Sequence, residues 1–310
     1  MTYLITGGGG FLGARLARAL KAKQPAAKIT LLDVAFPPGL EREFACVQGD
    51  LSEPKVLAAA LQRDTASIFH LAAVVSGGAE ADFDLGYRVN LDGTRALLEA
   101  CRALAAPPKI VYASSVAAFG GQLPEVLDDS TTPTPQTSYG TQKVIGEYLI
   151  ADYTRKGYVD GRSLRLPTVV VRPGKPNLAA SSFASGIIRE PLAGVEAACP
   201  VPDSTGVWIL SPRRVVEAFL HAHDLPSSAW PTTRVVNLPG ITLTVREMID
   251  AMGRVAGREA VDRVKFVPDA RIQGIVKTWP VRFRTDQARA MGFKADADFE
   301  SIVRDHMATA

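Results

Sequence analysis

The sequence has few cysteines and no long apolar run. Its three cysteines, Cys46, Cys101 and Cys199, lie far apart and form no CxxC pair, which argues against a zinc site and predicts free thiols in a reducing compartment. No apolar segment approaches the length that spans a bilayer, and no charged leader precedes the first apolar residues. We therefore expect a cytoplasmic protein with no membrane partner.

A strong excess of charge of one sign is also missing. The 35 lysines and arginines nearly balance the 32 acidic residues, which leaves a net charge of +3 without any basic run. A nucleic-acid-binding protein would carry a basic patch. Two of the four histidines, His221 and His223, lie two residues apart on an expected helix and so point to different faces. We expect a small-molecule partner, no nucleic acid and no metal.

Apolar segments of strand length alternate with helix-like segments through the first half of the chain. Strands that are apolar throughout, separated by helices, indicate a parallel sheet that is covered on both faces. The sequence therefore predicts an α/β, doubly wound Rossmann fold. The expected strands are at 3–6, 28–33, 44–50, 67–73, 109–115 and 163–171, and the expected helices begin at Phe11, near 54–63, near 82–105 and at about Tyr139.

The stretch TGGGGFLG, which begins at Thr6, joins the first strand to the first helix. Gly7, Gly10 and Gly13 form a GxxGxxG spacing, in which glycine permits a tight turn and lets a pyrophosphate approach the backbone at the helix N-terminus. Taken alone, the glycine spacing is weak evidence, and a flexible turn remains the alternative. The two glycines between Gly7 and Gly10 fall outside the spacing, and we expect small side chains to be tolerated there.

An aspartate at the end of the second strand favours the dinucleotide interpretation. Asp33 follows the loop at about 20 residues, where a carboxylate accepts hydrogen bonds from both hydroxyls of an adenosine ribose. No arginine or lysine follows at once to bind a 2′-phosphate, so we expect NAD rather than NADP. Asp50 is placed to meet the adenine amine, although a turn-forming aspartate explains its position almost as well.

Tyr139 and Lys143 lie four residues apart and therefore on the same face of one helix. A lysine cation close to a phenol favours the phenolate, which would let Tyr139 act as a general base. The strand KIVYASS delivers Ser114 and Ser115 to the carboxyl edge of the sheet, where ligands of open α/β sheets bind. A serine hydroxyl at that edge could hold the substrate oxygen.

Taken together, these motifs resemble those of the extended short-chain dehydrogenases/reductases, the NAD-dependent epimerase/dehydratase family. The resemblance covers roughly residues 3–175 and rests on the order TGGGGFLG, Asp33, GDL at 49–51, HLAA at 70–73, VNLDGT with Asn90, YASS and YxxxK.

The resemblance implies that Ser115, Tyr139 and Lys143 are catalytic, with Ser114 as the alternative serine. It also implies that Tyr139 and Lys143 contact the cofactor, the latter through the nicotinamide ribose. Each apolar position among the remaining implied cofactor contacts could equally belong to the core. These contacts are Phe11, Leu12, Leu51, Leu71, Ala72, Ala73, Asn90, Pro167 and Val169.

The alternation of strands and helices stops after Arg172. We expect a first, NAD-binding domain at 1–172 and a smaller, mixed α/β substrate-binding region at 173–310, partly interleaved with it. In the second region, Ser211 before Pro212 predicts a helix N-cap, and TVRE from Thr244 predicts a capping box.

Many extended members act on nucleotide sugars and carry an Arg-Asp-aromatic-Ile-His-Val type run. The corresponding region here reads VWILSPRRVVEAFL and lacks it, which argues against a nucleotide-sugar substrate. A free hydroxy acid needs only one or two cations or hydroxyls to anchor its carboxylate, although each candidate taken alone could equally be a surface residue. The substrate-binding candidates are Ser76, Ser115, Tyr139, Arg172, Lys175, Asn177 and Arg213.

The C-terminal half contains the stretches ILSPRRVVEAFLHAHDLP, VNLPGITLTVREMIDAMGRVAG and GIVKTWPVRFRTDQARAMGFKADADFESIV. These stretches resemble those of a subgroup of this family that oxidises D-erythronate to 2-oxo-tetronate with NAD. This resemblance implies sugar-acid oxidation with Tyr139 as general base. Two alternatives remain: a nucleotide-sugar epimerase or dehydratase, and an inactive dinucleotide-sensing protein. Relatives commonly dimerise through the helix before KIVYASS and the YxxxK helix, which implies a homodimer. Both segments are rich in alanine and leucine here, although a buried face of a monomer would look the same.

Overall fold

The computed structural model describes residues 1–174 and 180–309. The chain divides into two compact units. The first unit comprises residues 1–118, 137–165 and 216–236, and the second comprises residues 119–136, 166–215 and 237–310. The expected division at residue 172 into a cofactor domain and a substrate region stays a prediction.

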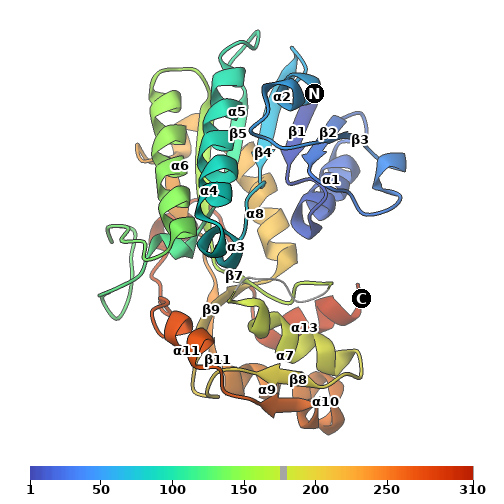
Figure 1. Ribbon diagram of the computed structural model, residues 1–310, viewed down its shortest axis with the longest axis vertical. Coiled ribbons are helices and arrows are strands. Elements are labelled where there is room, and N and C mark those ends of the chain that lie inside the picture. Colours follow the sequence, from blue (N-terminus) through green and yellow to red (C-terminus); the bar gives the residue numbers. More distant parts are fainter. Residues whose placement is uncertain (175–179, 310) are drawn as a thin grey trace. The chain divides into compact units, whose positions relative to one another are not determined.

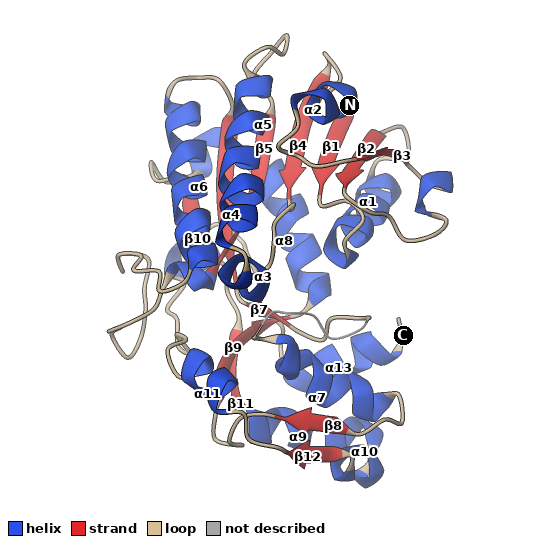
Figure 2. Cartoon of the chain, in the orientation of Figure 1, coloured by secondary structure: helices blue, strands red, loops and turns tan. Residues whose placement is uncertain are grey.

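Seven strands form the sheet of the first unit (Figure 2). The ladders that join β3, β2, β1, β4 and β5 are all parallel, which confirms the doubly wound α/β fold. The sheet order is β10-β6-β5-β4-β1-β2-β3, with β1 (Thr2–Thr6), β2 (Lys28–Asp33), β3 (Ala45–Gln48), β4 (Thr65–His70), β5 (Lys109–Ser115), β6 (Asp160–Leu166) and β10 (Val235–Asn237).

Helices cover both faces of this sheet because successive strand residues point to opposite sides. On one face, Leu4 and Ile110 pack into a cluster with Leu98 and Ile150, where α5 and α6 run side by side (Figure 1). On the other face, the rings of Tyr3, Phe69, Phe219 and His223 contact one another. The helices are α1 (Phe11–Lys23), α2 (Pro54–Ala60), α3 (Ser76–Ala81), α4 (Phe83–Gly86), α5 (Gly93–Cys101), α6 (Ser138–Arg155) and α8 (Pro212–Asp224), with 3-10 turns at Leu40–Arg42, Val116–Ala118 and Ser227–Ala229.

The helix expected near 82–105 differs from a single regular helix. It consists of α4, a π-helical turn at Tyr87–Asp92 and α5, and it ends at Cys101. Buried Asn90 lies inside the π-helical turn. Its side-chain amide bonds both the N–H and the carbonyl of Val74, at 2.7 and 3.0 Å. The irregular turn therefore coincides with a tertiary contact, which periodicity alone does not reveal.

The single strand expected at 163–171 was wrong. The segment forms β6, which begins earlier at Asp160, and β7 (Thr168–Val169), which pairs in parallel with β9 (Gly206–Leu210) in a separate sheet. Pro167 separates the two strands. Proline has no N–H to donate to a ladder, so the first sheet ends there.

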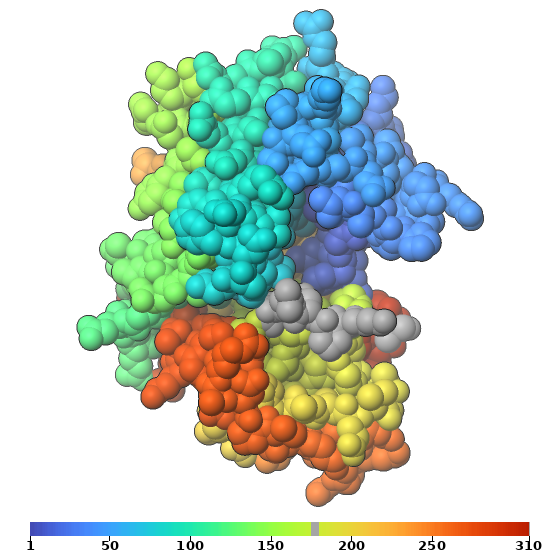
Figure 3. Space-filling model, viewed as in Figure 1, coloured from blue at the N-terminus to red at the C-terminus, as the bar shows by residue number. Residues whose placement is uncertain are grey.

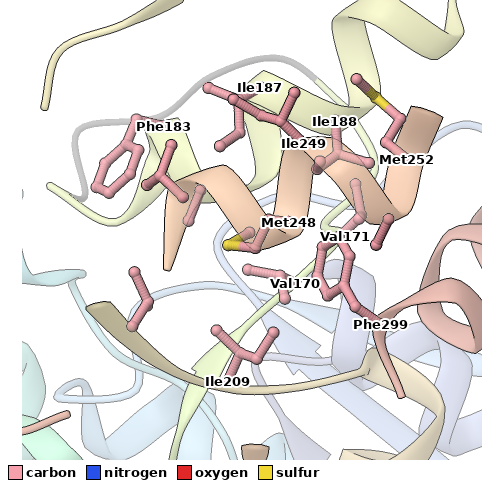
Figure 4. Packing of buried hydrophobic residues seen from close by; sticks show 14 of the residues in the cluster. Val170, Val171, Phe183, Ile187, Ile188, Ile209, Met248, Ile249, Met252 and Phe299 are labelled. Atoms are coloured by element: carbon pink, nitrogen blue, oxygen red, sulfur yellow. The ribbon is translucent and has the colours of Figure 1, made fainter. Parts of the chain in front are cut away.

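The second unit packs helices against two small sheets, β11-β9-β7 and β12-β8. Val170, Ile188, Ile209, Met248 and Phe299 belong to its buried apolar cluster (Figure 4). The other elements are α7 (Ser182–Leu192), β8 (Ala197–Cys199), β11 (Ile241–Thr244), α9 (Val245–Ala256), α10 (Arg258–Asp262), β12 (Val264–Phe266), α11 (Ala270–Val276), α12 (Asp286–Ala290) and α13 (Phe299–Met307).

Both predicted helix caps of this region are confirmed. Ser211 Oγ accepts a hydrogen bond of 3.1 Å from the N–H of Arg214 at the start of α8. Thr244 and Glu247 form the reciprocal capping box of α9. Within residues 1–174 and 180–309, no helix combines the length and apolarity needed to cross a membrane.

Candidate active site

The glycine loop packs closely against its surroundings at two of the three predicted positions. Gly7 has φ +70°, and a Cβ on it would lie 2.7 Å from the backbone nitrogen of Ala72. A Cβ on Gly13 would lie 2.2 Å from the carbonyl oxygen of Gly7, so α1 approaches the loop as closely as its backbone allows. These two glycines set the shape of the loop.

Gly10 is different because it borders open space. A Cβ there would meet a single neighbour, the carbonyl oxygen of Gly7 at 3.2 Å. Gly10 is also the N-cap of α1 and makes no side-chain capping bond. An open space beside an uncapped helix N-terminus fits a pyrophosphate, because the helix dipole and the first-turn N–H groups attract anions.

The expectation that the two remaining glycines tolerate small side chains was wrong. A Cβ on Gly9 would lie 2.0 Å from the carbonyl oxygen of Ala35, and a Cβ on Gly8 would lie 2.7 Å from Leu31 Cβ. The loop passes against the end of β2, so these positions are restricted by packing that the GxxGxxG spacing does not encode.

Asp33 closes β2 directly beside the loop. Its carboxylate accepts hydrogen bonds from the N–H of Gly9, at 2.9 Å, and from the N–H of Val34, at 2.7 Å. The side chain is half-buried. The predicted ribose-binding carboxylate is therefore fixed to the loop that is predicted to hold the pyrophosphate.

Asp50 is arranged as a turn residue. Its Oδ1 accepts bonds from both the N–H and the hydroxyl of Ser52, each at 2.8 Å, and its Oδ2 lies 3.6 Å from Nε of Arg88. Its contact with adenine stays a prediction. The neighbouring Leu51 is 4% exposed and belongs to the apolar cluster that includes Leu97 and Leu98 of α5, so core packing accounts for its apolar side chain.

The residues after β4 meet the glycine loop. Besides the close approach of Ala72 to Gly7, the N–H of Ala72 donates to Thr6 Oγ1 at 3.3 Å. Leu71, Ala72 and Ala73 are half-buried. Asn90 also donates to Oε1 of Gln142 on α6, at 2.7 Å, and so connects this segment to the helix that carries Tyr139.

Tyr139 and Lys143 lie on α6 as the spacing predicts. The helix is capped by Thr137, whose hydroxyl accepts from the N–H of Gly140 at 3.1 Å. Lys143 Nζ donates to the carbonyl of Ala113 at 2.8 Å and lies 5.5 Å from the centroid of the Tyr139 ring. Lys143 is 2% exposed, and burial lowers its pKa to about 7, against a smaller raising effect of Glu147.

His70 lies beneath this pair without carrying charge. Its Nδ1 is 2.7 Å from Thr6 Oγ1 and its Nε2 is 2.9 Å from Thr94 Oγ1. The ring stacks on Tyr112, with 5.3 Å between centroids. Burial, and then the nearby Lys143 cation, lower the pKa of His70 to about 3, so the imidazole is neutral near pH 7.

The two serines at the end of β5 have different surroundings. Ser114 is 2% exposed, and its hydroxyl donates to Oε1 of Glu147 at 2.5 Å. Ser115 is half-buried, and its Oγ accepts from the N–H of Ala117 at 3.1 Å. That contact leaves the Ser115 hydroxyl proton available, which favours Ser115 as the serine that meets a substrate.

The predicted substrate-binding residues are distributed over the chain. Ser76 begins α3 in the first unit, whereas Arg172 and Arg213 belong to the second unit, as do Pro167 and Val169 of the predicted cofactor contacts. Lys175 and Asn177 lie outside the described residues.

The two arginines both have partners within the second unit. Arg213 Nε donates to Asp305 at 2.6 Å, and Arg172 Nη2 approaches Ser181 Oγ at 3.4 Å. Their roles toward substrate stay predictions. Among the described residues, no group of three His, Cys, Asp or Glu side chains could hold a metal ion.

Sequence reasoning did not identify a buried ion pair next to the predicted catalytic residues. Glu147 and Arg165 form two hydrogen bonds, Nε to Oε1 at 2.8 Å and Nη2 to Oε2 at 2.6 Å. One sequence feature could have revealed this pair. Glu147 lies one helical turn beyond Lys143 and therefore on the same helix face, which must pack on the sheet and is an unusual place for a charge.

Comparison with known proteins gives a consistent result. The sequence model of the NAD dependent epimerase/dehydratase family matches residues 3–230. The chain is 54% identical to a D-erythronate dehydrogenase of Cupriavidus necator, over 100% of this chain and 99% of the relative. It is 46% identical to one of Haemophilus influenzae, over 98% of both. A crystal structure described as a nucleoside-diphosphate-sugar epimerase from Agrobacterium tumefaciens is 40% identical and superposes with a TM-score of 0.90, covering 99% of this chain and 94% of that one.

Proposed function

We propose, from the premise that this chain belongs to the NAD dependent epimerase/dehydratase family, that it oxidises D-erythronate to 2-oxo-tetronate with NAD⁺. The choice of D-erythronate as the substrate is supported by the full-length similarity to two D-erythronate dehydrogenases from different bacteria. The chemistry is supported by Tyr139 and Lys143 on one face of α6 and by a glycine loop with space for a pyrophosphate at Gly10.

In this proposal each residue of the site has a distinct task. The Ser115 hydroxyl holds the substrate oxygen, and Tyr139 takes the proton from the C2 hydroxyl as general base. Lys143 binds the nicotinamide ribose and favours the phenolate of Tyr139 by its charge. Bound NAD⁺ supplies a nicotinamide ring that accepts the hydride leaving C2. The balanced reaction yields the 2-oxo acid, NADH and one proton.

The test is NADH absorbance on mixing the protein with NAD⁺ and a panel of free aldonates and uronates. D-Erythronate is expected to give the highest kcat/KM. If every acid leaves the absorbance unchanged, the proposal is rejected.

A second candidate, a nucleotide-sugar epimerase, is favoured by the description of the Agrobacterium tumefaciens structure. An epimerase recycles its cofactor, so UDP-sugars in the same panel would be converted without net NADH. Sugar analysis by chromatography distinguishes this outcome from inactivity. An inactive dinucleotide sensor would bind NAD⁺ and convert nothing.

We further propose a homodimer formed through α5 and α6. Both helices lie at the surface of the first unit (Figure 3), and the ring of Tyr148 on α6 is 67% exposed, so it is accessible to a partner. Light scattering on the intact protein is expected to give twice the chain mass, and Tyr148→Glu is expected to shift it toward the monomer. A wild-type monomer at micromolar concentration contradicts this.

We also propose a cytoplasmic location. The three cysteines are free thiols in the structure, as suits a reducing compartment. Cell fractionation tests this, and recovery in the membrane or periplasmic fraction would contradict it.

A further inference from the structure

The YxxxK helix carries a third buried polar residue, Glu147, one turn beyond Lys143. Its side chain is 3% exposed and its carboxylate accepts three hydrogen bonds. Two come from Arg165 on β6 and one comes from Ser114 on β5. The three residues therefore join α6 to two adjacent strands directly behind the predicted catalytic residues.

A cluster of this kind is a poor way to gain stability. Removing two charges from water costs several kcal/mol for each ion, and a well-packed apolar replacement is often as stable or more so. The side chain of Arg165 is 10% exposed, so solvent compensates little of that cost. Stability alone therefore does not account for the pair.

The surroundings of Lys143 indicate what that role is. On β5, Ala113 offers its carbonyl at 2.8 Å and the Tyr112 ring lies 4.8 Å from Nζ. On β4, His70 is neutral, because its pKa is lowered to about 3. On α6 itself, Tyr139 is the base that the ammonium must assist.

Glu147 is thus the anion among the groups that face Lys143. Burial lowers the pKa of Lys143, and the Glu147 carboxylate raises it. Residues four apart on a helix have Cβ atoms about 5–6 Å from each other, so this attraction acts at short range in a poorly solvated region. Arg165 lies on β6 and forms the two-pronged contact that holds the carboxylate in place.

We propose that Glu147 is a positioning residue, held by Arg165, whose buried carboxylate keeps Lys143 protonated beneath Tyr139 and binds Ser114 away from the substrate. This inference rests on the proposed function of Tyr139 and Lys143. It adds Glu147 and Arg165 to the machinery without either touching substrate.

The decisive variant is Glu147→Gln, which keeps the side-chain shape and removes the charge. Lysine-selective NMR of the protein without cofactor, with the Lys143 signal assigned from Lys143→Met, follows the protonation of that side chain directly. We expect the midpoint to fall by about one pH unit, because an anion at this range favours the ammonium. The alkaline limb of the pH profile of kcat/KM is expected to move to lower pH by the same amount.

The matched control is Asp152→Asn, which removes a carboxylate from the exposed face of the same helix. Asp152 pairs with Arg155 at 2.7 Å, and its side chain is 57% exposed. The NMR midpoint of Lys143 and the alkaline limb of the pH profile of kcat/KM are both expected to stay at their wild-type values.

Glu147→Gln leaves Arg165 buried without its anion, so this variant can fail to fold. The triple variant Ser114→Ala, Glu147→Leu, Arg165→Met removes every polar group of the cluster and is expected to melt at or above the wild-type temperature. The Lys143 midpoint is expected to fall in the same direction, but by less than in Glu147→Gln, because the Arg165 cation is removed together with the carboxylate. A stable triple variant with a wild-type midpoint would overturn the inference.

The proposed D-erythronate oxidation and the proposed positioning role of Glu147 can be rejected independently of each other. The NMR titration uses the protein without cofactor or substrate, so it reports on Glu147 even if D-erythronate is not the substrate. An enzyme that oxidises D-erythronate, with Lys143 titrating identically in Glu147→Gln and wild type, would reject the positioning role alone.

Discussion

The backbone N–H of Gly9 donates a hydrogen bond of 2.9 Å to the carboxylate of Asp33. The bond links the glycine loop to the end of β2, so the predicted pyrophosphate site and the predicted ribose site are joined directly. It also accounts for the cramped position of Gly9, whose α-carbon is held against the carbonyl of Ala35.

Two glycines of the same loop are expected to respond differently to alanine. Gly9→Ala brings a methyl group to 2.0 Å from the Ala35 carbonyl oxygen, which overpacks the loop and is expected to cost about 1–3 kcal/mol of unfolding free energy. Gly10→Ala is expected to cost less, at most about 1 kcal/mol, because its backbone φ of −70° suits alanine and its one close contact, with the Gly7 carbonyl oxygen at 3.2 Å, needs only a small shift.

The second effect is on cofactor affinity. The Gly10→Ala methyl fills the space that we assign to the pyrophosphate, so the Kd for NAD⁺ is expected to rise at least about tenfold, or about 1.4 kcal/mol. Urea unfolding and calorimetric titration measure the two quantities. Wild-type NAD⁺ affinity in Gly10→Ala would remove the loop from the cofactor site.

Asp33 is expected to determine the choice of cofactor. Asp33→Ala removes the ribose acceptor and is expected to reduce the preference for NAD⁺ over NADP⁺ by about 10–100-fold, the usual value of a charged hydrogen bond. Asp33→Asn removes the charge but keeps an oxygen that can accept from the Gly9 N–H. This variant therefore distinguishes the effect of the charge on cofactor choice from the effect of losing the bond to the loop. Steady-state kcat/KM with each cofactor is the measurement, and an unchanged ratio in both variants contradicts the assignment.

Tyr139→Phe is expected to lose about 10²–10⁴-fold in turnover, since it removes the general base. NAD⁺ affinity is expected to stay near wild type because the ring remains. Tyr148→Phe makes the same chemical change on the exposed face of α6 and serves as the control. Comparable turnover in the two variants would reject Tyr139 as the base.

Alanine substitutions of the two adjacent serines are expected to have different effects, one on turnover and the other on the free energy of unfolding. Ser115→Ala is expected to reduce kcat by about 10²-fold or more, with little change in unfolding free energy, because its partner is the substrate. Ser114→Ala removes a buried bond to Glu147 and is expected to cost about 1–3 kcal/mol of stability, with turnover close to wild type. The reverse pattern would make Ser114 the catalytic serine.

His70 is expected to make the protein sensitive to acid. Its pKa is about 3 in the folded protein and 6.5 in an ordinary histidine, so the unfolded chain binds one more proton between these values. Stability is therefore fully present above about pH 6.5 and falls as the pH decreases, with a limiting slope of about 1.4 kcal/mol per pH unit. Urea unfolding at several pH values is expected to show a shallower slope in His70→Gln. Equal slopes would contradict this origin.

Several features of both units follow from local sequence. Strand β5 of the first unit was predicted with the bounds that the structure shows, and the Ser211 and Thr244 caps of the second unit were predicted from short residue patterns. Tyr139 and Lys143 could be placed on one face because a helix has a fixed period. Backbone geometry repeats locally, so a pattern over a few residues is sufficient for these features.

Tertiary structure decided the features that join distant segments. The Gly9 and Ala35 contact, the Asn90 bond to Val74 and the Glu147 and Arg165 pair each connect residues whose spacing in the sequence has no period. The sequence alone determined the fold class, the place of the glycine loop between β1 and α1, and the YxxxK face of α6. Only folding determined which glycines are crowded, which serine is occupied and which buried carboxylate faces Lys143, because close packing depends on the neighbours that the completed sheet brings together.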